Sequence, residues 1–476
     1  MNSRASRPAT QWRVGRRSLL KAAGATAAAT AASGMTAGIA RAATRRNAAG
    51  DEIADAIIIG AGYAGGTVAR ELSAQGMSSI ILEARDRVGG RIWTDTFAGA
   101  QVEVGGGWVG AQQVLVQREL SRYGITTEID VAPERMMLPS ENGFESMTPT
   151  EALAVLSPLW AEFYAGADDY FERPSEPLYR RDLLEGVDWK SLADRLDEIA
   201  LSPTEFMRLN GETSMYSGGP STIGALTGMA QWFQLAGGTY GSFLSTADKP
   251  AGGMTALLDA MLADAQADVR FDSPVTSITE SGGQVTVETT GGATFAAPVV
   301  VVATPTNVWK HISFQPGLPP AQAAAAGDGI GVPHSKKMWL HVSNKEAVTV
   351  QAEEGAPIAM LMSAQELDEG RLMVAFPGPS LDTSDAAAVQ QAVQQLLPGT
   401  SVLDYRSQDW GRDPWSRGGW GLRRPNQLLD LFPQIEEPHG RILFAGADIA
   451  QGWHGAYIEG AVESGLRAAQ QALSLA

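Results

Sequence analysis

The feature that most constrains the fold is a glycine-rich turn between two short apolar runs near residue 60. Residues 56–59 (AIII) and 79–82 (SIIL) are typical of buried strands, and residues 64–75 between them have helical composition. The turn from the first strand into the helix contains three glycines with the spacing G-x-G-x-x-G: Gly60, Gly62 and Gly65. This order predicts a strand–helix–strand unit of a parallel sheet.

The same turn predicts a dinucleotide site. Its glycines let backbone N–H groups approach a pyrophosphate at the positive end of the helix. Glu83 follows the second strand, where a carboxylate can accept hydrogen bonds from ribose hydroxyls. A glycine triplet alone is weak evidence, but both strands and the acid are present here.

The residues after Glu83 indicate which dinucleotide binds. The segment EARDRVGGR (83–91) groups Arg85, Arg87 and Arg91 around a glycine pair. An FAD pyrophosphate explains such a basic, glycine-hinged extension, whereas a nicotinamide dinucleotide does not. The segment VEVGGGWVG (102–110) is again rich in glycine, which lets the backbone approach a ligand closely. We therefore also expect cofactor contacts from Gly106, Gly107 and Trp108. The alternative is an ordinary charged surface turn.

The first 42 residues form a separate segment. They contain seven Lys or Arg and no acid, and GRRSLLK precedes an Ala-, Gly- and Thr-rich run that ends at Ala40-Arg41-Ala42. This order predicts a cleavable export signal of the twin-arginine type, removed near Ala42, and hence a periplasmic or exported protein. The alternative, a membrane anchor, is disfavoured because Ala, Thr and Gly are poor partners for hydrocarbon.

Composition excludes several classes of site. Without the signal segment, the chain has 29 basic and 53 acidic side chains, which gives a net charge near −24. This charge argues against nucleic acid and anionic membrane as partners. The charge fits either steering of a cationic substrate or solubility alone. The absence of cysteine excludes disulfides, thiolate metal sites and thioether-linked flavin. Five scattered histidines show no metal-ligand spacing, so we expect no metal.

Separated motifs across residues 52–476 resemble the flavin-containing amine oxidase family, which has the monoamine oxidase-like fold. Besides EARDRVGGR, these motifs are GGGWVG, PAGGMTALLDAML, VRFDSPVTSI, VVVVATP, DPWSRGGW and the C-terminal GRILFAGADIAQGWHGAYIEGAVESG. Within the family, the segments GGTYGSFLSTADKPAGG and GWH...GAVESGLRA are most similar to the exported bacterial branch of nicotine oxidoreductases and pseudooxynicotine amine oxidases.

The resemblance implies an α/β fold in which a Rossmann-like FAD-binding domain is interleaved with an α+β substrate-binding domain. We assign three segments to the FAD-binding domain: 51–125, 250–315 and 435–476. Two segments are assigned to the substrate-binding domain: 126–249 and 316–434. Residues 145–235 have helical periodicity, while 336–342 and 371–378 are typical of strands.

The resemblance also implies catalytic residues. Trp420 and Tyr457 match the two aromatic residues that stand beside the flavin as a cage around the amine. The nicotine branch has an amide at one cage position, so Tyr457 departs toward the general amine oxidase pattern. Lys337 matches a lysine that is hydrogen-bonded through water to flavin N5, and strand alternation means that Lys336 cannot point the same way. The alternatives are ordinary core aromatics and a surface lysine.

Further cofactor contacts follow from the same resemblance. Gly446 and Asp448 match a turn at the ribityl and phosphate groups, Trp453 and Tyr457 belong to the flavin-side segment, and Val275 matches a backbone contact to adenine. A helix starting near Tyr457 or Gly460 would direct its positive end at the flavin. Gly419 stands where some relatives carry a flavin-linking cysteine, so we expect noncovalent FAD.

These residues together predict an FAD-dependent oxidation of an amine to an imine by hydride transfer to flavin N5, followed by hydrolysis. The favoured substrate is a nicotine-pathway alkaloid amine such as pseudooxynicotine or nicotine. Alternatives are oxidation of a polyamine, an aromatic monoamine or an L-amino acid, a flavin-dependent desaturase or isomerase, and a redox-silent FAD scaffold. The expected electron acceptor is O2 or a periplasmic cytochrome. We expect no membrane insertion, and the residues leave the oligomeric state open, with a homodimer as one option.

Overall fold

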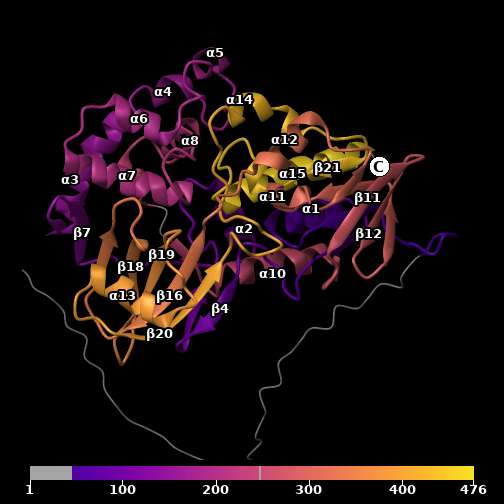
Figure 1. Cartoon of the computed structure of the whole chain (residues 1–476). Helices are drawn as coiled ribbons and strands as arrows, with labels where there is room; N and C mark the ends of the chain where they lie inside the picture. Colours follow the sequence, from indigo (N-terminus) through magenta and orange to yellow (C-terminus); the bar gives the residue numbers. More distant parts are fainter. Residues whose placement is uncertain (1–45, 246–247, 476) are drawn as a thin grey trace, which may run out of the picture. The chain divides into compact units, whose positions relative to one another are not determined.

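The computed structural model describes residues 46–245 and 248–475 (Figure 1). The predicted export signal, residues 1–42, lies outside the described residues. Within the described ranges, no helix has both the length and the apolar character that crossing a bilayer requires.

A five-stranded parallel sheet forms the core of the predicted dinucleotide-binding region. Its strands lie in the order β10 (Asp268–Arg270), β3 (Ser79–Leu82), β2 (Ala56–Ile59), β14 (Val299–Val302) and β21 (Ile442–Phe444). The central strands β2 and β14 have the sequences AIII and VVVV and are buried along their whole length. Such runs require cover on both faces, as is usual for parallel sheets.

The predicted strand–helix–strand unit is present. The strands at 56–59 and 79–82 have the predicted bounds, and the helix between them, α1 (Tyr63–Ala74), starts and ends one residue before the predicted range 64–75. Helix α1 packs against α10 (Gly253–Ala265) and against the C-terminal helix α15 (Ile458–Leu475). The fold class predicted from the sequence is therefore confirmed.

A second five-stranded sheet extends from this region (Figure 1, β11 and β12). Its strands lie in the order β1 (Glu52–Ile53), β13 (Thr294–Ala297), β12 (Gln284–Thr289), β11 (Val275–Ser281) and β15 (Ser313–Gln315). It contributes Val275, the first residue of β11, to the site described below.

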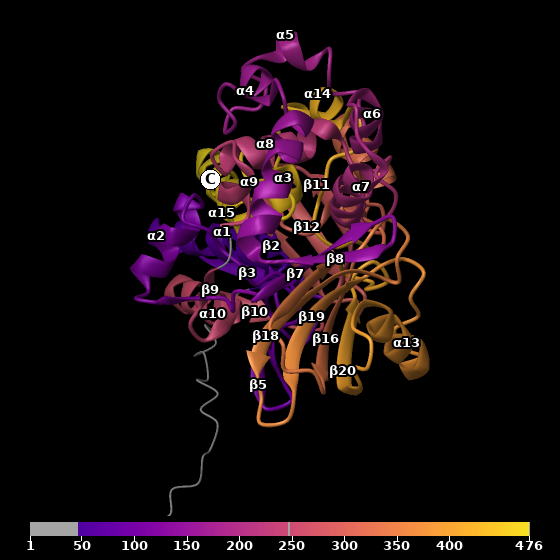
Figure 2. The ribbon, with the colours of Figure 1, turned by 90° about the vertical axis from the view of Figure 1, so that its left-hand side faces the viewer.

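A seven-stranded mixed sheet is the third large sheet of the structure (Figure 2). Its order is β20 (Val402–Asp409), β16 (Lys336–Val342), β19 (Arg371–Pro377), β18 (Ile358–Glu366), β17 (Val348–Gln351), β7 (Arg135–Ser140) and β8 (Gly143–Met147). The strand predictions at 336–342 and 371–378 are borne out, the second ending one residue early. The helical prediction for 145–235 is wrong at its start, because residues 145–147 pair with β7.

Helices cover this sheet on both faces. Helix α13 (Ala386–Leu396) packs on one face, where its residues share a core with Met338 and Leu340 of β16. On the other side lie α3 (Pro149–Phe163), α7 (Pro203–Ser217) and α8 (Leu226–Leu235), which Figures 1 and 2 both show above the strands. The division into two domains stays a prediction. The parallel sheet draws its strands from the segments assigned to FAD binding, and the seven-stranded sheet draws them from the other two.

Candidate active site

A cavity of about 770 Å³ lies between the carboxyl ends of the parallel strands and the seven-stranded sheet. Ligand sites of open α/β sheets are expected at these strand ends. Most of the predicted site residues line it: Gly60, Gly62, Glu83, Arg85, Arg91, Gly106, Gly107, Trp108, Val275, Lys337, Trp420, Gly446 and Tyr457. Three predicted residues do not line it, namely Gly65, Asp448 and Trp453, and each supports a residue that does.

The glycine turn fits a pyrophosphate. Gly60 has φ +105°, and a Cβ there would lie 3.0 Å from the Ala303 carbonyl oxygen. At Gly62 an added Cβ would clash with nothing, since its nearest atom, the Gly89 carbonyl oxygen, would lie 3.8 Å away. None of the described side chains caps the N-terminus of α1, so its first amides are available to an anion. Gly65 instead packs the helix onto the turn, because its Cβ would lie 2.0 Å from the Gly60 oxygen.

Glu83 fixes the shape of this turn. Its Oε2 accepts a hydrogen bond from the Ala61 N–H (2.9 Å), and its Oε1 accepts one from the Arg85 N–H (2.9 Å). Each carboxylate oxygen keeps a further lone pair. Glu83 can therefore hold the turn and still accept from a ribose hydroxyl in the cavity.

The three arginines of the 83–91 segment have different roles. Arg91 donates to the Gly419 carbonyl (2.8 Å) and pairs with the buried Asp448 (2.8 Å). Asp448 does not line the cavity and is connected to it by its ion pair with Arg91; its predicted cofactor contact stays a prediction. Arg85 pairs with Asp413. Arg87 does not line the cavity; it donates to the Gly90 carbonyl (3.0 Å) and so closes the turn.

Lys337 lies in the cavity wall and Lys336 does not. Strand β16 directs Lys336 to the other side, where its Nζ donates to the Leu381 carbonyl (2.6 Å). The buried Lys337 Nζ donates to the Gly105 carbonyl (2.8 Å) and lies 4.3 Å from the centre of the Trp108 ring. Burial lowers the pKa of Lys337 to about 7, with the nearby Glu103 carboxylate opposing the shift and Lys249 adding to it.

Asp130, Lys249 and Lys337 lie around the Trp108 ring, and the Glu103 carboxylate acts electrostatically on Lys337. We call these four groups the Lys337 cluster. Lys249 pairs with Asp130 (2.7 Å), which also accepts from Trp108 Nε1 (2.8 Å). Glu103 is buried, and its Oε1 accepts from the Met254 N–H (2.8 Å). Burial raises the pKa of Glu103. No sequence signal marked Glu103, Asp130 or Lys249, because they come from separate segments.

Two aromatic side chains wall the cavity. Trp420 Nε1 donates to the Tyr216 carbonyl of α7 (2.7 Å). Tyr457 stands at the entrance of α15, with its ring edge-on to Trp232 (centroids 5.5 Å apart) and Trp453 (4.5 Å). Trp453 is buried against Tyr457, supports this wall and does not line the cavity; its predicted cofactor contact stays a prediction.

The remaining wall is mostly apolar and was not predicted. Its side chains include Met215, Tyr216, Tyr240, Phe243, Met360, Met362 and Phe376. Glu212 of α7 lies among them; it is 3% exposed and accepts from Tyr240 Oη (2.9 Å). Burial raises the pKa of Glu212 to about 7. An acid in a helical stretch usually lies on the surface, so no sequence pattern marked Glu212 as a site residue.

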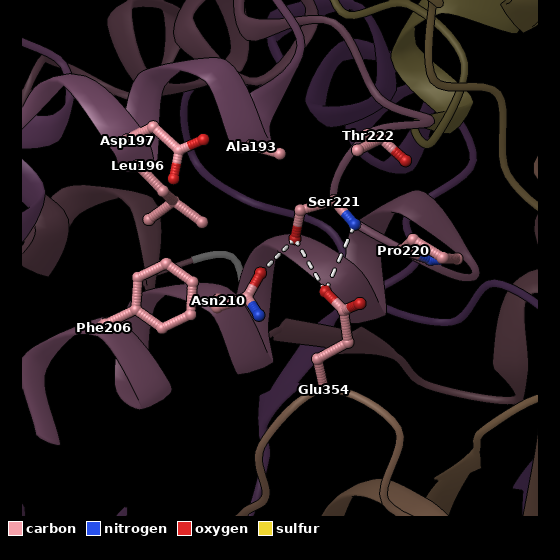
Figure 3. A pocket seen from close by; sticks show the side chains of 9 residues that line it. All are labelled: Ala193, Leu196, Asp197, Phe206, Asn210, Pro220, Ser221, Thr222 and Glu354. Carbon is pink, nitrogen blue, oxygen red and sulfur yellow. Dashed lines mark hydrogen bonds between the residues drawn. The ribbon is translucent and has the colours of Figure 1, made fainter. Parts of the chain in front are cut away.

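A smaller pocket of about 180 Å³ involves other residues of α7 (Figure 3). Its polar groups pair with one another: Ser221 Oγ donates to Asn210 Oδ1 (2.6 Å), and Glu354 lies beside it (Figure 3). Helix α7 thus presents Asn210 to this pocket and Glu212 to the cavity. Because the pocket's hydrogen bonds are internal, the larger cavity is the candidate active site.

Comparison with known proteins gives consistent matches over nearly the whole chain. The model of the family described as flavin containing amine oxidoreductase matches residues 63–473. A nicotine dehydrogenase of Pseudomonas putida is 34% identical over 88% of this chain and 88% of its own. A pseudooxynicotine dehydrogenase of a Pseudomonas species is 32% identical over 88% of this chain and 86% of its own.

Solved structures agree on the fold. A putrescine oxidase double mutant superposes with a TM-score of 0.74, covers 89% of this chain and 99% of its own, and is 22% identical. At this identity the likeness concerns the fold alone.

Proposed function

The chain belongs to the flavin-containing amine oxidoreductases, and on that premise we propose that it binds FAD noncovalently and oxidises a nicotine-pathway alkaloid amine. Pseudooxynicotine and nicotine are the favoured substrates. The observation that carries the proposal is one continuous cavity, which joins the glycine turn at Gly62 to Lys337 and to the aromatic walls Trp420 and Tyr457.

The cavity residues fit FAD. The uncapped amides of α1 and the open face of Gly62 suit a pyrophosphate, Glu83 suits a ribose, and Val275 lies in the same wall. Noncovalent binding is supported at Gly419, where an added Cβ would lie 2.0 Å from Ser335 Oγ. A linking side chain therefore has no room there, and the chain contains no cysteine.

When bound, the flavin supplies the two-electron acceptor for the hydride that leaves the carbon beside the amine nitrogen. Trp420 and Tyr457 confine the amine between their rings and favour nitrogen through their π faces. The apolar wall limits water around the reacting carbon. Lys337, with a pKa of about 7, can hold or release a proton at Nζ and orient a water molecule beside the cofactor. Water entering later converts the imine to a carbonyl product and a free amine.

A polyamine is the second candidate substrate, because the acid Glu212 lies in the substrate wall. An L-amino acid fits less well. In the described part of α7 and of strands β17 to β19, no arginine lines the cavity to hold a substrate carboxylate. Arg208 of α7 pairs with Glu145 instead.

Three further parts of the proposal rest on the sequence. They are export through the twin-arginine route to the periplasm, reoxidation by O2 or a periplasmic cytochrome, and a small-molecule amine as the partner, with a homodimer as one option for the assembly. Folding before export would let the protein leave the cytoplasm with FAD already bound.

The test is an anaerobic absorbance titration of the purified protein with pseudooxynicotine, nicotine, putrescine, phenylethylamine and several L-amino acids. We expect bleaching of the flavin by one of the first two. Air or cytochrome c added afterwards restores the colour, and the faster of them identifies the acceptor. A flavin that none of these amines bleaches would contradict the proposal.

A further inference from the structure

Glu212 is a buried acid that pairs with no Lys or Arg in the part of the chain that the structure describes. Its side chain lines the cavity and is 3% exposed. Among the described residues, its hydrogen-bond partner is Tyr240, and no Lys or Arg pairs with it. Arg208, one turn earlier on α7, is directed to Glu145 and to the Pro139 carbonyl. A carboxyl group held by one neutral hydroxyl is costly to bury, so it calls for a further partner.

Other buried acids of the protein have structural partners that Glu212 lacks. Glu459 accepts from the Leu115 and Val116 N–H groups (2.8 Å each) and so caps α2 (Val114–Arg122). Glu83 accepts from two backbone amides as well. Glu212 accepts from no backbone amide of the described chain. Its retention in the cavity is therefore not explained by a cap or a turn.

The position of Glu212 relates it to the aromatic walls. Tyr216, one helical turn further along α7, holds Trp420 through its carbonyl. Residues four apart on a helix have Cβ atoms about 6 Å apart on the same face. A substrate lying against Trp420 can therefore extend a second group along α7 to Glu212. Met215 and Phe243 in the same wall offer such a group only apolar contact. The hydroxyls of Tyr216 and Tyr240 are neutral and offer it no charge.

We propose that Glu212 forms a hydrogen bond with a second basic nitrogen of the substrate, remote from the amine that is oxidised. The proposal rests on the proposed function, and it specifies the substrate class as amines that carry two nitrogens. A ring nitrogen of the pyridine type would accept a hydrogen bond from the protonated carboxyl. An aliphatic ammonium would donate one to the carboxylate. In both cases one hydrogen bond joins Glu212 to the substrate nitrogen. The proton belongs to the carboxyl group in the first case and to the nitrogen in the second.

The pH dependence of KM distinguishes the pyridine-type nitrogen from the aliphatic ammonium. The titratable groups around Glu212 are Tyr164, Tyr216 and Tyr240, and burial raises the pKa of each, so they stay neutral. Glu212, with a pKa of about 7, is protonated below that pH and ionised above it. KM should thus rise above pH 7 for a pyridine-bearing amine and fall above pH 7 for a diamine.

The experiment compares matched substrates on the FAD-loaded protein. One pair is nicotine and its phenyl analogue, and the other is putrescine and butylamine. Variants are Glu212→Leu and Glu212→Gln, with Glu354→Gln from the surface pocket as the control. Melting temperature and FAD content establish that each variant is folded and loaded.

We expect Glu212→Leu to raise KM about tenfold to a hundredfold for the two-nitrogen substrate alone and to leave kcat nearly unchanged. Glu212→Gln should abolish the pH dependence of KM, and Glu354→Gln should change neither quantity. If Glu212→Leu changed KM equally for both members of a pair, the proposal would be overturned. The same would follow if the wild-type protein had equal KM values for both members. If no amine bleaches the flavin, the proposed function itself fails, which is a different result.

Discussion

Lys337 is a buried lysine whose pKa burial lowers to about 7. A lysine with a folded pKa near 7 and an ordinary unfolded pKa near 10.5 binds fewer protons in the folded state between these values. Stability therefore rises with pH from about 7 to about 10.5, and below pH 7 the full cost of burying the charge is present.

Replacing this lysine should reveal that cost. We expect Lys337→Met to raise the Tm at pH 7 by about 2 °C or more, while amine turnover falls. The Tm difference should shrink as pH rises toward 10.5, because the unfolded wild-type chain then also loses its proton. Thermal melts from pH 6 to 10 measure this, and a Tm difference independent of pH would contradict a neutral, buried Lys337.

Two glycines of the same turn should respond differently to the same substitution. Gly62 faces the cavity, so Gly62→Val should fold with a near-normal Tm but lose FAD. Gly65 faces the Gly60 carbonyl at a distance that no Cβ tolerates, so Gly65→Val should lower the Tm by about 4 °C or more. Flavin absorbance and thermal melts of the apoproteins separate the two effects. Equal loss of stability in both variants would refute the distinction.

At the scale of elements, the short strands β6 (Thr127–Ile129) and β9 (Asp248–Pro250) bring Asp130 and Lys249 to Trp108. Removing the like charge of Lys249 should raise the pKa of Lys337. We therefore expect Lys249→Met to move the inflection of amine turnover near pH 7 to higher pH. The exposed Lys345→Met serves as the control and should leave the profile in place. An unchanged profile in Lys249→Met would show that the two charges do not interact.

The aromatic walls come from different elements, since Trp420 is held by α7 and Tyr457 by the start of α15. Their contributions should therefore be separable. Trp420→Ala or Tyr457→Ala should lower amine turnover about tenfold to a hundredfold and leave FAD bound. Trp189→Ala, on the surface, is the control. Unchanged kinetics in both wall variants would mean that the amine binds elsewhere.

At the scale of the whole molecule, the site exists because two sheets face one cavity. Alternation along the seven-stranded sheet sends Lys337, Thr349 and Gln351 into it, while Met338 and Val350 enter the core under α13. The parallel sheet supplies the glycine turn and Glu83 from its strand ends. Neither sheet alone would bring an anion-binding turn, a buried lysine and an apolar wall together.

The sequence by itself determined the parts that depend on local order. Three parts follow from short-range patterns: the strand–glycine–helix unit, Glu83 after β3 and the strand carrying Lys337. Their hydrophobic periodicity and their need for glycine at particular φ values can be recognised from neighbouring residues. For the same reason the family was recognisable from separated short motifs. The start of the helical region at residue 145 was misjudged, because β8 forms only through its pairing with β7.

Tertiary structure alone decided which residues stand at the cavity and which support it. Asp448 reaches the cavity through Arg91, which lies more than 300 positions away in the sequence. Trp453 lies behind Tyr457 because of how the turn before α15 packs. The Lys337 cluster and the lone carboxyl of Glu212 arise from contacts across 28 to more than 200 positions of the chain. Burial shifts the pKa values of these groups. Because burial arises only when distant segments pack together, neighbouring residues in the sequence cannot predict it.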